Sequence, residues 1–112
     1  MDNNEERRRL PRIEVSWSVS VFTDEETIEG ESRNISSEGL YICIDKPLPL
    51  NETFRISINP PHHQAIGVTG KIIWSDLYGI DVDKGVCCIG VCLVEISEDD
   101  RCFLKDLISA YP

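Results

Sequence analysis

The chain has 112 residues, of which 41% are apolar and 28% charged, with a formal net charge of −9. This length suits one domain that buries most of the surface its unfolded form exposes. The acidic balance argues against a general nucleic-acid binder, because recognition of a phosphate backbone needs a broad basic surface. Residues 1–12 hold four basic and three acidic side chains, so this arm carries net +1 and the other hundred residues carry −10.

Several features predict a cytoplasmic protein. The first six residues carry acids rather than an apolar run, and the longest uncharged apolar stretch, residues 86–94, is too short to cross a bilayer. Five cysteines make an odd count without the pattern of a small secreted domain. We therefore expect free thiols in a reducing compartment, and no insertion into a membrane.

The N-terminal arm contains two arginines spaced so that both could contact one ligand. Pro11 lacks an N–H and biases Leu10 toward extended conformations, so this segment is not helical. In an extended chain Arg8 and Arg12 share one face, with their Cα atoms roughly 13 Å apart. Such a pair could hold a ligand that presents two anionic or purine-like groups. Arg33, farther along, is the one other basic residue beside a candidate site, Asn34.

Alternating apolar and polar residues predict the first strand, over 13–21. A second extended segment follows at about 27–34, and residues 36–39 predict a tight turn with Gly39 in its fourth position. Further strands are expected at 40–44, 53–58, 66–74 and 86–96, with a long loop at 75–85. Six short strands with turn signals favour a barrel or a sandwich.

The apolar period changes to that of a helix from residue 97 onward. Ser97 can cap the N-terminus of this helix, acidic residues occupy its first turn, and apolar pairs recur at i,i+4. We expect a short amphipathic helix at about 97–110 that covers the open end of the barrel.

Other polar and aromatic residues have structural interpretations. Cys87, Cys88 and Cys92 lack Cys-x-x-Cys spacing, which favours buried structural thiols over a zinc site, so no metal is expected. The two histidines at 62–63 lie in a proline-flanked loop and are expected to face solvent. Trp17 and Trp74 occupy positions that the strand pattern assigns to the core.

Two motifs in this order resemble the PilZ domain family over about residues 6–110. They are Arg8-x-x-x-Arg12 and Asn34-x-Ser36-x-x-Gly39, and they are followed by the run Gly-Lys-Ile-Ile-Trp at 70–74 and Ile-Gly-Val at 89–91. The resemblance implies an all-β fold, a six-stranded antiparallel β-barrel of the split-barrel type with a C-terminal α-helix. It also implies a bacterial receptor for the second messenger cyclic di-GMP rather than an enzyme. The chain would divide into a flexible Arg-bearing arm, 1–12, and the barrel with its helix, 13–112.

The resemblance carries cyclic di-GMP contacts onto Arg7, Arg8, Arg12, Asn34, Ser36 and Gly39. Arginine forks match guanine O6 and N7, can pair with phosphate, and can stack on a base. Asn34 and Ser36 lie two apart on an extended segment and so point to one side. Asn34 stands where the family often has Asp, which weakens a contact to guanine N–H groups. Gly39 would supply a backbone conformation and a close approach that a side chain obstructs.

An arginine just before the Arg-x-x-x-Arg motif accompanies two intercalated ligands in similar PilZ proteins. Arg7 therefore favours two cyclic di-GMP molecules per chain, and one molecule per chain is the alternative. Binding would order the arm against the turn, and an unidentified downstream protein would read the change. The domain would be a monomer or a weak dimer.

Two other functions fit the residues less well. A PilZ-like protein-interaction module that does not bind nucleotide is the main alternative, although the presence of both motifs counts against it. A small barrel that binds single-stranded nucleic acid is disfavoured by the net charge and by only eight aromatic residues. No nucleophile–base pair or metal-ligand set indicates an enzyme.

Overall fold

The computed structural model describes the backbone of residues 12–81 and 86–110, and the side chains of these residues except 76–81 and 86. The expected contacts of Arg7 and Arg8 lie outside this part of the chain. In chain order the described elements are β1 (Arg12–Ile13), β2 (Ser18–Phe22), β3 (Thr27–Ser36), β4 (Gly39–Ile44), β5 (Thr53–Asn59), β6 (Ile66–Asp81), β7 (Val86–Ile96) and α2 (Glu98–Ala110).

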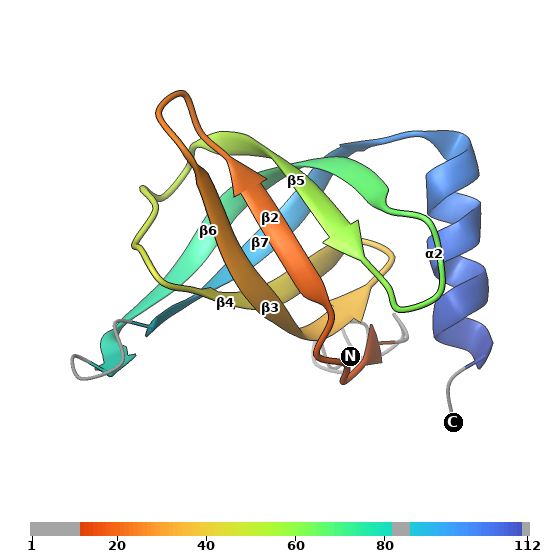
Figure 1. Cartoon of the computed structure of the whole chain (residues 1–112), viewed down its shortest axis with the longest axis horizontal. Coiled ribbons are helices and arrows are strands. Elements are labelled where there is room, and N and C mark those ends of the chain that lie inside the picture. The colour runs from red at the N-terminus through yellow and green to blue at the C-terminus, as the bar shows by residue number, and fades with distance from the viewer. Residues whose placement is uncertain (1–11, 82–85, 111–112) are drawn as a thin grey trace, which may run out of the picture.

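Six of the strands form a closed antiparallel barrel. They follow the order β3-β2-β5-β6-β7-β4, and the pairing of β3 with β4 closes the ring. The short β1 lies outside the ring and pairs with the end of β3. Figure 1 shows α2 standing at one end of the barrel, while the β6–β7 hairpin extends from the opposite end. The predicted six-stranded barrel with a C-terminal helix is confirmed.

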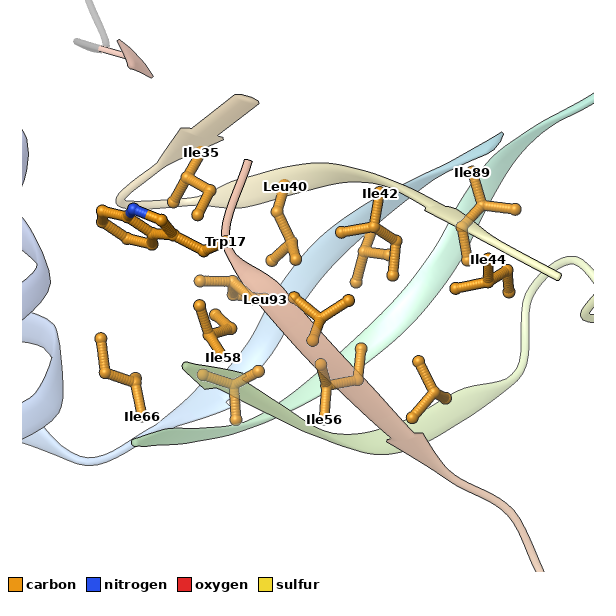
Figure 2. Close-up of a cluster of buried hydrophobic side chains, with 14 of the residues drawn as sticks. Trp17, Ile35, Leu40, Ile42, Ile44, Ile56, Ile58, Ile66, Ile89 and Leu93 are labelled. Atoms are coloured by element: carbon orange, nitrogen blue, oxygen red, sulfur yellow. The ribbon is translucent and has the colours of Figure 1, made fainter. Parts of the chain in front are cut away.

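The barrel interior is filled by branched aliphatic side chains. Inward-facing residues alternate along the strands, and those with 1% exposure or less include Val19, Val21, Ile35, Ile42, Ile56, Ile58, Ile66, Val68, Ile72 and Ile89. Figure 2 shows Trp17 beside Ile35 at one end of this cluster. From α2, Leu104 and Ile108 join the same core. The helix begins as predicted, because the Ser97 hydroxyl accepts a hydrogen bond from the Asp100 N–H at 3.1 Å.

The segment 13–21 is not one strand. Ile13 pairs with Ile35 of β3 and Ser18 pairs with Glu31, so five steps along this segment oppose four steps along β3. The chain therefore leaves the ladder at 14–17, although burial still alternates as the sequence predicts. The buried Ser32 hydroxyl bridges the gap: it donates to the Val15 carbonyl and accepts from the Trp17 N–H at 2.9 Å.

The expected loop does not begin at residue 75, and the expected burial of Trp74 is also wrong; residues 82–85 lie outside the described part of the chain. Strand β6 continues to Asp81, which pairs with Val86 of β7. The β6–β7 register shifts between Ile72 and Trp74, so the simple alternation fails there. Ile72 is buried, while Ile73 is 58% and Trp74 48% exposed. Both side chains that follow Ile72 therefore lie on the outside of the barrel.

Not all the cysteines are free thiols. Cys43 of β4 and Cys88 of β7 are register partners and form a disulfide. Cys87 is buried, Cys92 is half-buried, and Cys102 is exposed on α2. The expectation of free thiols is wrong for Cys43 and Cys88, because they lie 45 positions apart and only the strand pairing brings them together.

Candidate functional site

The segment Asn34-x-Ser36-x-x-Gly39 forms the end of β3, a two-residue connection and the start of β4. The predicted tight turn is confirmed. The Ser36 hydroxyl accepts hydrogen bonds from the N–H groups of Glu38 and Gly39, both at 3.2 Å, and donates one to the Gly39 carbonyl at 3.3 Å. Ser36 therefore closes the turn through its own side chain, which a hydroxyl at this position can do without distorting the strand.

Position 39 requires a glycine because the start of β4 lies very close to the backbone of β7. A Cβ atom built on Gly39 would lie 2.6 Å from the carbonyl oxygen of Val91 in β7. The backbone of Gly39 does not adopt the left-handed conformation, so lack of space, and not a special φ, excludes a side chain here. The glycine lets the motif turn lie directly against β7.

The pairing of β1 with β3 brings Arg12 to the motif. Arg12 is the register partner of Ser36, and Ile13 is the partner of Ile35. The Arg12 side chain is exposed. The last arginine of the N-terminal arm thus lies next to the turn, although 24 positions of sequence separate it from Ser36.

A β-bulge turns two consecutive side chains outward. Ser32 pairs with Ile42, but the next pair joins Asn34 to Tyr41, so two steps along β3 oppose one step along β4. Arg33 is exposed and Asn34 half-buried, between Ser32 and Ile35, which are both buried.

These two residues line one open depression. Its volume is about 490 Å³, within the range of small-molecule sites. Its described lining is Glu14, Arg33, Asn34, Tyr41, Cys43 and Cys88. Arg12 and Ser36 are not part of this lining. A ligand that uses all of the motif must therefore extend from the depression to the turn, a distance of two residues along β3.

An aromatic pair continues the site across the barrel surface. Asn34 pairs with Tyr41, Tyr41 with Gly90 and Gly90 with Trp74, so these residues form one row over four strands. Because Gly90 has no side chain, the rings of Tyr41 and Trp74 meet above it, with centroids 5.6 Å apart and planes at 53°. The sequence missed this pair, since the bulge that exposes Trp74 leaves no local signal.

The turn is anchored from behind by the helix and by β7. The Arg101 guanidinium of α2 donates to the Ser37 carbonyl at 3.2 Å and lies 3.8 Å from the Glu38 carboxylate. The Leu93 N–H of β7 donates to the Glu38 carbonyl at 3.0 Å. These contacts fix the position of the turn relative to the barrel.

Among residues 12–81 and 86–110, no group of three or more His, Cys, Asp or Glu side chains is placed to hold a metal ion. The helix of this region is neither long nor apolar enough to span a membrane.

The described residues thus combine a closed antiparallel barrel, a C-terminal helix at one end of it and an arginine beside an Asn-x-Ser-x-x-Gly turn. The model of the PilZ domain family matches residues 6–110, so the chain belongs to the PilZ family. No curated protein matches the chain.

Solved structures share the fold at low sequence identity. The inhibitor of motility MotI/DgrA from Bacillus subtilis has a TM-score of 0.76 at 20% identity, covering 92% of this chain and 50% of that one. The PilZ domain of YcgR from Escherichia coli with c-di-GMP has a TM-score of 0.74 at 17% identity, covering 93% and 90%. YcgR in complex with c-di-GMP gives 0.75 at 15% identity, covering 93% of this chain and 45% of that one. The chain spans about half of two of these proteins.

Proposed function

We propose that this PilZ domain is a non-enzymatic receptor for cyclic di-GMP. The observation that carries the proposal is the β1–β3 register, which puts Arg12 opposite Ser36 of the turn. An arginine, the motif turn and a depression of suitable size thus occupy one end of β3. The cyclic di-GMP complexes of YcgR, which share the fold, support the choice of ligand.

Each residue of the proposed site has a chemical role. The Arg12 fork can pair with guanine O6 and N7 or with a phosphate, and Arg8 would act in the same way. The Asn34 amide can meet a guanine edge from inside the depression. The half-buried ring of Tyr41 and the exposed ring of Trp74 offer a surface on which a purine can stack.

Ser36 and Gly39 contribute chiefly through the shape of the turn. The hydrogen bonds of the Ser36 hydroxyl hold the turn, and Gly39 allows its approach to β7. An extra cation at Arg7 would help to offset the four phosphate charges of two ligand molecules. We therefore propose two cyclic di-GMP molecules per chain.

The proposal includes a switch at the N-terminus. In the proposed switch, the part of the arm that precedes β1 closes over the ligand against the turn, where Arg12 is already paired with Ser36, and a downstream protein reads the ordered arm. Hydrogen exchange in residues 5–12 should slow at saturating ligand. Unchanged exchange would refute the switch and leave the binding proposal intact.

Isothermal titration with cyclic di-GMP tests the proposal. The wild type should bind saturably, and an Arg8→Ala/Arg12→Ala variant should lose most of that binding. An Arg55→Ala/Lys105→Ala variant is the control, because it removes the same charge from exposed positions on β5 and α2. Cyclic di-AMP, which has the same phosphates, should bind weakly because adenine lacks the O6 acceptor.

The titration separates the alternatives. A ratio of two ligands per chain supports the role of Arg7, and a ratio of one refutes it. Absence of heat and of a thermal shift with the wild type would refute the receptor and leave a protein-interaction module.

A further inference from the structure

We propose that Arg33 is a further ligand-binding residue, which contacts a phosphate of the cyclic dinucleotide. This inference rests on the proposed function. In a regular strand Arg33 and Asn34 would face opposite sides. The bulge between Ser32 and Asn34 changes this, so both side chains line the same depression.

The Arg33 side chain is held in place at one of its nitrogens. Its Nε donates to the Sγ of Cys43 at 3.3 Å, and Cys43 is tied to Cys88 by the disulfide. Among the described residues, no hydrogen bond or ion pair engages the two terminal nitrogens of Arg33. The Nε contact restrains the stem of Arg33, and its two terminal nitrogens stay available as parallel donors that match the oxygens of a phosphodiester. A restrained stem lowers the side-chain freedom that is lost on binding.

Arg33 is the one described charge at this position that attracts an anion. Arg33 carries the only positive charge among the described lining of the depression, opposite the single acid Glu14. On its other side Arg33 borders a smaller depression of about 220 Å³, lined also by Glu29, Glu31 and Asp45. These carboxylates repel a phosphate, so Arg33 is what makes this end of β3 acceptable to an anionic ligand.

The test compares two arginines that differ in position but not in charge. Cyclic di-GMP is titrated into the wild type, Arg33→Ala, Arg33→Lys and Arg55→Ala. Arg55 is the control, because it is exposed on β5 and lines a different depression. Thermal unfolding of each variant without ligand checks that the fold is retained, and titrations at two salt concentrations report the number of charges at the contact.

Arg33→Ala should weaken binding about tenfold, as expected for one charge-assisted contact at an open site. Arg33→Lys should lose about threefold, because the charge remains but the fork is lost. Arg55→Ala should stay within about twofold, and only Arg33→Ala should reduce the salt dependence.

The outcomes distinguish this inference from the proposed function. Equal losses for Arg33→Ala and Arg55→Ala would show that net charge alone matters and would overturn the inference. So would an unchanged affinity for Arg33→Ala when the wild type binds. A wild type that does not bind at all would refute the proposed function itself, and the role of Arg33 with it.

Discussion

Loss of the Cys43–Cys88 disulfide should destabilise the domain strongly. The bond joins residues 45 positions apart, so it removes a large loop from the freedom of the unfolded chain. In the chain-entropy description a loop of this length contributes about 4 kcal/mol at 25 °C. The folded state loses little when the bond breaks, because the two residues are already register partners in the β4–β7 ladder.

Urea unfolding with and without reductant measures this contribution as a free energy, and thermal unfolding measures the corresponding change in Tm. For a domain of this size, 1 kcal/mol corresponds to about 4 °C in Tm, so reduction should lower Tm by about 15 °C. A Cys43→Ser/Cys88→Ser variant should match the reduced wild type and should not respond to reductant. Cys102→Ser is the control, because this cysteine is exposed on α2 and free.

Counting thiols in denatured, unreduced protein tests the bond itself. Three thiols should react, from Cys87, Cys92 and Cys102, and five should react after reduction. Five reactive thiols before reduction would refute the disulfide. A destabilisation below about 1 kcal/mol, with the bond present, would refute the entropic reasoning.

Three substitutions probe the surroundings of the site, each by urea unfolding. Ser32→Ala should cost about 2–4 kcal/mol, because it removes the hydroxyl that bridges residues 15 and 17, and a cost below about 1 kcal/mol would contradict that role. Gly39→Ala should cost about 1–3 kcal/mol, since its Cβ would lie 2.6 Å from the Val91 carbonyl; a neutral result would show that the strands separate freely. Arg101→Ala should cost about 1 kcal/mol and speed amide exchange in the turn, and unchanged exchange would contradict the anchoring contact.

Local signals were sufficient for most of the fold. The alternation over 13–21 predicted which side chains are buried, and the spacing from Ser36 to Gly39 predicted the turn. Ser97 and the apolar pairs after it predicted the helix and its start. Each of these patterns depends on residues within a few positions of one another, and hydrophobic burial or hydrogen bonding enforces it locally.

The register between strands could not be predicted from the sequence. A bulge depends on the partner strand, so the outward turn of Arg33 and of Trp74 has no local signature. The same holds for the disulfide, since Cys43 and Cys88 become neighbours only when β4 pairs with β7.

For the candidate site, the sequence was enough to identify the motif residues Asn34, Ser36 and Gly39 and to predict the turn that they form. Three features became visible only with the strands paired: Arg12 lies opposite Ser36, Arg33 joins Asn34 in one depression, and an aromatic pair continues the same row. A turn motif depends on residues within a few positions of one another, whereas closure of the barrel sets which distant residues become neighbours.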